Sequence, residues 1–105
     1  MRAVFVVLTT VPGPKSGRRI AEMLVRRKLA ACVSVGGTFR SVYRWKGNIE
    51  SARESLVLIK TSKKNFGRVE KLIKKIHPYE VPEILGLPVH RVSAGYSNWL
   101  TAALR

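Results

Sequence analysis

The feature that most constrains the fold is a pair of unusually long strand-like segments joined by a tight turn. The first, "AACVSVGGTFRSVYRW", covers residues 30–45, and the second runs from about Ile49 to Lys60. The intervening "KGN" (46–48) is typical of a short hairpin turn that contains glycine. The two segments have 16 and about 12 residues, whereas most strands have about five or six. We therefore expect a hairpin that extends beyond the body of its own domain.

The outer part of this hairpin carries aromatic side chains on one face. Because side chains alternate along a strand, two sets face opposite ways. One set is Phe39, Ser41, Tyr43 and Trp45, and the other is Arg40, Val42 and Arg44. Gly36-Gly37 predicts a bulge or a bend before them. A ribbon with exposed aromatic surface and open edges aggregates unless it is covered. We therefore expect further copies of the chain to cover it.

The rest of the chain alternates between strand-like and helical patterns. Residues 3–10 form a continuous β-branched run, as in a central strand buried on both faces, and 83–92 resemble the last main strand. Helical spacing runs from Lys15 to Leu29. A second helix, capped by Thr61 or Ser62, carries one core stripe. The stripe holds Phe66, Val69, Ile73 and Ile76, and a short closing helix is spaced by Tyr96, Trp99, Leu100 and Ala103.

This order of elements predicts an α+β fold. Strand, helix, strand, strand, helix, strand is the ferredoxin-like split βαβ sandwich, in which two helices cover one face of a four-stranded antiparallel sheet. The long hairpin and the short C-terminal helix are additions to it. The length of 105 residues predicts that 1–105 form a single domain.

The composition of the chain limits the classes of binding partner that it can have. Twenty lysines and arginines against six acids give a net charge of +14, which suggests a nucleic acid or another polyanion. The basic residues fall on the expected solvent faces of the two helices, so nucleic acid is the less favoured partner. No apolar run approaches the roughly 18 residues of a membrane span, so we expect no membrane partner. The N-terminal "MRAVFVVLTTVPG" has an arginine and an apolar run like those of a signal peptide, but its β-branched content and lack of a small-residue cleavage site favour a buried strand and a cytoplasmic location. The single cysteine, Cys32, is expected to be a small buried residue, with a redox or soft-metal role as the alternative.

The segment "HPYEVPEI" (77–84) holds one of two histidines and two of six acids between prolines. Pro78 ends the second helix. His77 is interpreted either as a hydrogen-bonded helix terminus or as a ligand to a metal or substrate. Glu80 either caps or pairs with an arginine of a neighbouring subunit, or lines a cleft between subunits together with Tyr79. The other residues expected in that cleft are Tyr43, Trp45 and Lys60. Ser62, with two lysines after it, is a weak candidate anion site.

Several of these blocks together resemble one known family. They are "KLAAC" (28–32), "SVYRWKGNIE" (41–50), "LIKT" (58–61), "HPYEVPEI" (77–84) and "Y..WL" (96–100). In register over nearly the whole chain, they resemble the CutA family of divalent-cation-tolerance proteins. The resemblance implies a ferredoxin-like subunit in a tight homotrimer held by its long hairpins, similar to PII signalling proteins. It also implies a role in tolerance to copper and other divalent cations, with no established enzymatic reaction.

The resemblance implies a copper site of which this chain keeps one part. In the bacterial pattern, copper ligation is attributed to a cysteine at the end of the first strand and to two adjacent histidines before the proline. Those places hold Thr9, Ile76 and His77 here. The predicted metal ligand is therefore His77, with further ligands from threefold symmetry or a nearby carboxylate.

The sequence thus favours a non-enzymatic trimeric protein of divalent-cation response. Copper, another divalent cation or a small anion is expected at intersubunit clefts. The cleft residues are Tyr43, Trp45, Lys60, His77, Tyr79 and Glu80. One alternative is a basic module that binds nucleic acid or another polyanion. Another is an enzyme in which His77, Tyr79, Glu80 and Lys60 converge.

Overall fold

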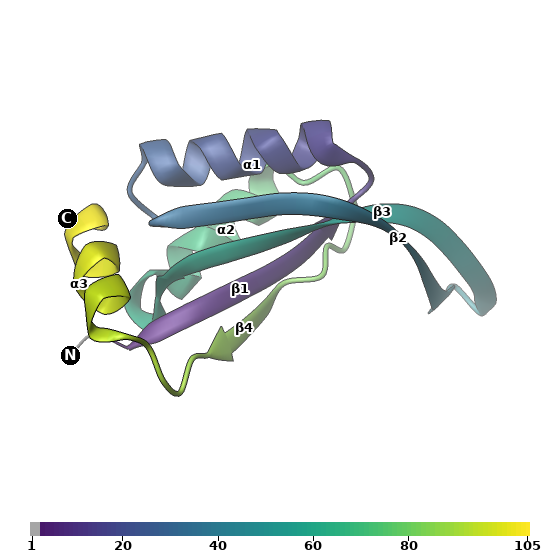
Figure 1. Cartoon of the computed structure of the whole chain (residues 1–105). Helices are drawn as coiled ribbons and strands as arrows, with labels where there is room; N and C mark the ends of the chain where they lie inside the picture. Colours follow the sequence, from purple (N-terminus) through teal and green to yellow (C-terminus); the bar gives the residue numbers. More distant parts are fainter. Residues whose placement is uncertain (1–2) are drawn as a thin grey trace.

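A computed structural model describes residues 3–105 of the chain (Figure 1). The strands are β1 (Val4–Val11), β2 (Cys32–Trp45), β3 (Asn48–Ser62) and β4 (Leu85–Pro88). The helices are α1 (Pro14–Arg26), α2 (Phe66–Ile76) and α3 (Ala94–Ala103), with a 3₁₀ turn at Lys63–Asn65. The strands form one antiparallel sheet in the order β2-β3-β1-β4, with α1 and α2 on one face. The predicted ferredoxin-like α+β fold is confirmed.

The core lies between this sheet and the two helices. Its fully buried side chains include Val7 and Val11 of β1, Val57 and Ile59 of β3, Ile20 and Leu24 of α1, and Val69 and Ile73 of α2. The predicted stripe of α2 is confirmed, because Phe66 and Ile76 also pack against this cluster. Burial of each such side chain stabilises the fold by about 1.5 to 3 kcal/mol. None of the helices within residues 3–105 is both long and apolar enough to cross a membrane.

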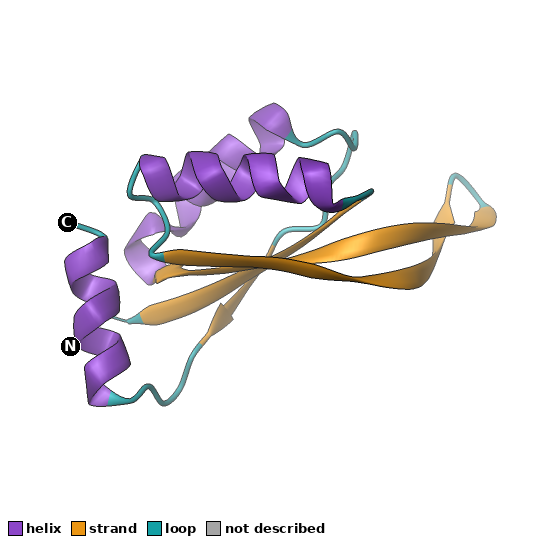
Figure 2. Ribbon diagram, turned by 45° about the horizontal axis from the view of Figure 1, so that its top comes forward, coloured by secondary structure: helices purple, strands orange, loops and turns teal. Residues whose placement is uncertain are grey.

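The opposite face of the sheet is largely uncovered. Leu8 of β1 pairs with Leu58 of β3 on one side and with Leu85 of β4 on the other, so the three side chains share this face. Leu85 and Leu87 are 48 % and 46 % exposed. α3 covers only one end of the face, through Leu100, and Figure 2 shows α1 and α2 on the other side. The domain therefore presents an open apolar sheet face.

The long hairpin extends past the body of the domain, as predicted (Figure 2). β1 pairs with β3 only from Ser55 to Ser62, so residues 39–54 pair only within the hairpin. The predicted bulge lies between Gly36 and Phe39. At the tip, Lys46 and Gly47 have φ values of 50° and 82°. Two positive values in a two-residue turn match the right-handed twist of the strands. We call residues 39–54 the outer ribbon.

Two details of the sequence prediction are wrong. Neither Thr61 nor Ser62 caps a helix by its side chain, because β3 continues to Ser62 and the 3₁₀ turn precedes α2. The Thr61 hydroxyl instead donates to the Leu29 carbonyl at 2.6 Å. The last strand is shorter than 83–92, since only Leu85–Pro88 pair with β1. Its position at the sheet edge agrees with the proline at its end.

Candidate functional site

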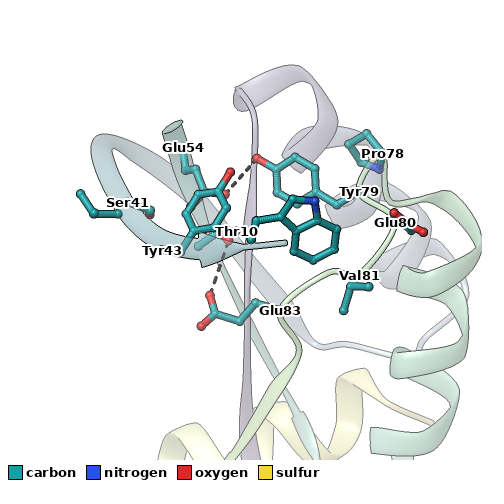
Figure 3. Close-up of a pocket in the computed structure, with 11 residues that line it drawn as sticks. Thr10, Ser41, Tyr43, Glu54, Pro78, Tyr79, Glu80, Val81 and Glu83 are labelled. Carbon is teal, nitrogen blue, oxygen red and sulfur yellow. Dashed lines mark hydrogen bonds between the residues drawn. The ribbon is translucent and has the colours of Figure 1, made fainter. Parts of the chain in front are cut away.

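A pocket opens where the outer ribbon leaves the sheet (Figure 3). Its volume is about 620 Å³. Three segments supply its walls: the end of β1, the outer ribbon, and the loop that follows α2. The lining residues are Thr10, Ser41, Val42, Tyr43, Trp45, Glu54, Pro78, Tyr79, Glu80, Val81 and Glu83. The pocket therefore exists only because the fold brings the "HPYEVPEI" loop against the ribbon.

Four of the six expected site residues meet at this pocket. Tyr43 and Trp45 come from β2, and Tyr79 and Glu80 come from the loop after α2. The two ribbon aromatics are 45 % and 40 % exposed, so their rings are available to a ligand or to another subunit. These four residues were expected in a cleft between subunits, and the structure brings them together within one chain.

Glu54 and Tyr79 form the buried polar contact of the pocket. The Tyr79 hydroxyl donates to Glu54 Oε2 at 2.9 Å, and Glu54 is only 7 % exposed. Burial, and next the hydrogen bond to this carboxylate, raise the pKa of Tyr79 to about 12. The phenol is therefore protonated at neutral pH and serves as the donor. A second, longer contact joins the Thr10 hydroxyl to Glu83 Oε1 at 3.5 Å (Figure 3).

His77 lies behind the pocket wall, and both of its ring nitrogens are engaged. It is 8 % exposed and adopts the extended conformation that ends α2. Nδ1 accepts from the Tyr79 backbone N–H at 3.0 Å, and Nε2 lies 2.8 Å from the Thr10 carbonyl. Since a carbonyl only accepts, Nε2 carries the proton. The imidazole thus ties the Tyr79 loop to the end of β1.

Lys60 lies away from the pocket. It pairs with Val6, whereas the pocket begins near Thr10 at the other end of β1. Its Nζ donates to the Ser34 hydroxyl and lies 3.8 Å from the sulfur of Cys32. Cys32 is only partly buried, contrary to the expectation of a buried residue. One chain alone therefore does not bring Lys60 to the expected cleft.

The metal donors of one chain do not fit a metal centre by themselves. Thr9 is fully buried in β1 and Ile76 ends α2, so two of the three implied positions have no suitable ligand atom. The third, His77, already uses both nitrogens. Across residues 3–105, no group of three histidine, cysteine or acidic side chains is close enough to hold a metal ion.

The acidic residues are distributed unevenly. Glu22 pairs with Arg26 within α1 at 4.0 Å, and Glu70 pairs with Lys74 within α2 at 3.2 Å. The remaining acids are Glu50, Glu54, Glu80 and Glu83. Within residues 3–105 none of these four forms an ion pair, and three of them line the pocket. None of the described lining residues is basic. The charge of the pocket therefore favours a cation.

Sequence reasoning missed Glu54 as a site residue. The signal was present, because alternation along the ribbon places Glu50, Ala52 and Glu54 on one face of the return strand. The observed pairing of Tyr43 with Glu50 and of Phe39 with Glu54 puts that face with the aromatic side chains. Extending the alternation across the turn would have identified Glu54.

Comparison with known proteins decides the family. The family described as "CutA1 divalent ion tolerance protein" matches residues 5–103. The chain belongs to the CutA1 family.

Individual CutA proteins are similar to this chain over most of its length. The divalent-cation tolerance protein CutA of Thermus thermophilus is 42 % identical over 95 residues, covering 90 % of this chain and 92 % of that protein. The solved structure of the periplasmic divalent cation tolerance protein CutA from Archaeoglobus fulgidus has a TM-score of 0.94 at 30 % identity. That match covers 97 % of this chain and 99 % of the other.

Other CutA1 family members are longer. The chloroplastic protein CutA of Arabidopsis thaliana is 37 % identical over 100 residues, which cover 95 % of this chain. The matched region is only 55 % of the plant protein's own length. The CutA1 family thus includes proteins described as chloroplastic and as periplasmic.

Proposed function

We propose that this chain acts in divalent-cation tolerance as a non-enzymatic, cytoplasmic homotrimer, similar in assembly to PII proteins. The observation that carries the proposal is the uncovered outer ribbon. Val42 and Ile49 are 67 % and 65 % exposed there, beside the half-exposed Tyr43 and Trp45. Such a surface is stable when a neighbouring subunit buries it. The open apolar sheet face supports the same assembly.

The proposed ligand is copper or another divalent cation. One chain contributes His77 in the implied position, but its ring must release the Tyr79 amide before Nδ1 can bind a metal. Further ligands must then come from neighbouring subunits or from the pocket carboxylates. A small anion is the alternative ligand of the cleft. It is disfavoured within the pocket itself, where the charged side chains are Glu54, Glu80 and Glu83.

Two measurements test this proposal. Light scattering at micromolar concentration is expected to give about three times the 11.8 kDa chain mass. Calorimetric titration with Cu(II) and Zn(II) is expected to show binding that His77→Ala removes. The matched control is His90→Ala, since His90 is exposed and outside the pocket. A stable monomer refutes the trimer, and equal titrations of the two variants refute His77 as a ligand.

Polyanion binding is a second candidate, favoured by one observation. Twelve of the twenty basic residues lie in or beside α1 and α2, and all are exposed. They are Lys15, Arg18, Arg19, Arg26, Arg27, Lys28, Lys63, Lys64, Arg68, Lys71, Lys74 and Lys75. Binding of a nucleic acid to this layer should weaken by orders of magnitude between about 50 and 200 mM salt. Binding that persists unchanged across that range contradicts a contact of this kind.

A further inference from the structure

We propose that the pocket beside the outer ribbon binds an organic cation that carries N–H donors, such as an alkylguanidinium or alkylammonium group. The inference concerns the same pocket as the proposed function. It rests on that function only in assuming that the pocket lies within the proposed trimer. It requires no metal. Its basis is the combination of a buried carboxylate, two further carboxylates and aromatic walls in one cavity.

The first observation is the state of Glu54. Its side chain is 7 % exposed, and Tyr79 donates to only one of its oxygens, Oε2. Within residues 3–105, Oε1 makes no hydrogen bond and the carboxylate has no ion-pair partner. Oε1 is not one of the fully buried unpartnered atoms within residues 3–105, which are the hydroxyls of Thr9 and Ser62, so water or a ligand in the pocket can reach it. An N–H donor with a positive charge would satisfy Oε1 from the pocket.

The second observation is the charge at the pocket mouth. Glu80 and Glu83 are exposed lining residues, and the only side-chain hydrogen bond of Glu83 within residues 3–105 is the 3.5 Å bond from Thr10. Three of the six acids of a chain with net charge +14 are therefore gathered around one cavity. Of the basic residues of the ribbon, Arg40, Arg44 and Arg53 face away from the aromatic side. Lys46, at the turn, is not a lining residue, but its ammonium lies 5.8 Å from the centroid of the Trp45 ring, so a bound cation has to share or displace that contact. The local field favours a cation despite the overall charge.

The third observation distinguishes an organic cation from a bare metal ion. Tyr43, Trp45 and Tyr79 contribute aromatic surface to the lining. Aromatic faces attract organic cations, and a planar guanidinium can also stack on them. The volume of about 620 Å³ lies within the range of small-molecule pockets. By contrast, the donors within the described residues do not include the three clustered ligands that a metal centre needs.

The proposal can be tested by fluorescence with Trp45 as the reporter. Trp99→Phe removes the other tryptophan, which lies on α3 at the far end of the domain (Figure 1). The protein is titrated with n-butylguanidinium and, in parallel, with n-butylurea, which has nearly the same shape without the charge. We expect saturable binding of the guanidinium alone, weakened by salt.

Variants then locate the binding. Glu54→Gln should weaken binding of n-butylguanidinium about tenfold, because it removes the buried charge. Glu80→Gln, at an exposed position, should weaken binding of n-butylguanidinium by a smaller factor. It is the test variant if Glu54→Gln does not fold. The matched control is Glu22→Gln, since Glu22 is an exposed acid on α1 outside the pocket. It should bind as the unaltered protein does.

Three outcomes overturn the inference. Equal binding of n-butylurea means that the pocket selects only apolar shape. Equal binding by the Glu54, Glu80 and Glu22 variants means that the cation binds elsewhere. No binding of n-butylguanidinium to the assembled protein means that the pocket is closed, for example by a side chain of a neighbouring copy. Light scattering and the Cu(II) titration are measured separately, so failure here is distinguishable from failure of the proposed function.

Discussion

The two ends of the same hairpin differ in what holds them in place. At the base, Val57 and Ile59 of β3 are fully buried between β1, β2 and the helices. In the outer ribbon, Val42 and Ile49 are 67 % and 65 % exposed. The backbone pairing is equally regular in both parts, apart from the bulge at the boundary. Because an isolated two-stranded ribbon is marginally stable, the outer part depends on contacts beyond its own pairing, and within this chain the hydrogen bond from Tyr79 to Glu54 is one of them.

The largest effect that tests this comparison is expected from Ile59→Ala. It removes a fully buried side chain from the centre of the core. The expected loss in the free energy of unfolding is about 3 to 4 kcal/mol, from lost burial and the cavity left behind. Urea denaturation of the purified variant measures it.

Ile49→Ala is the matched control, since it makes the same change ten positions earlier on the same strand. Ile49 is 65 % exposed, so the loss contributed by this chain's own contacts should be below about 0.5 kcal/mol. A loss as large as at Ile59 would show that a neighbour packs the ribbon as densely as the core. The difference in side-chain burial between the base and the outer ribbon would then exist only in the isolated chain and not in the assembled protein.

A smaller effect, on assembly, is expected from Trp45→Asp. Trp45 is 40 % exposed in the single chain, and the proposed trimer would bury part of that exposed surface. A charge placed in such a contact should weaken it by about 2 to 3 kcal/mol per chain. Light scattering over a dilution series should therefore detect dissociation at higher concentrations than for the unaltered protein. The far-ultraviolet spectrum serves as the control for folding, and an unchanged dilution profile contradicts a role for Trp45 in the interface.

Most of the fold was predictable because its signals are local. The 3, 4, 3 spacing of apolar residues in α2 and the β-branched run of β1 each report which face is buried. The hairpin was predictable from strand length and from the glycine turn. The false helix cap at Thr61 and Ser62 had a different cause. Polar residues suited to a cap are equally suited to hydrogen bonding within a strand, and pairing of β3 with β1 decided between them.

The site was predictable only in part, because it depends on which segments far apart in the sequence lie close together in space. The sequence connected Tyr43 and Trp45 with Tyr79, and the pocket contains all three. It also placed Lys60 there, but distance along a strand separates Lys60 from the ribbon. The engagement of both His77 nitrogens was not predictable, since one partner is a carbonyl 67 residues earlier in the chain.

The smallest effect concerns the contact that joins the ribbon to the body, and Tyr79→Phe tests it. The change removes the hydrogen bond to Glu54, at an expected cost of about 1 to 2 kcal/mol in the free energy of unfolding. Folding raises the pKa of Tyr79 from 10.0 to about 12, so the unfolded chain loses its proton first as pH rises.

The stabilisation by Tyr79 is therefore fully present below pH 10 and is lost as the pH rises towards about 12. The difference in stability between the unaltered protein and Tyr79→Phe should shrink over that interval, which urea denaturation at several pH values can measure. Because both proteins share every lysine and arginine, titration of those groups cancels in the difference. Tyr96→Phe is the comparison variant, since Tyr96 lies on α3, away from the pocket. Burial raises the pKa of Tyr96 as well, so its difference should change with pH in the same direction but without any contribution from Glu54. A difference for Tyr79→Phe that stays constant up to pH 12 would mean that its hydroxyl is not held by Glu54, and that the ribbon and the loop are not joined there.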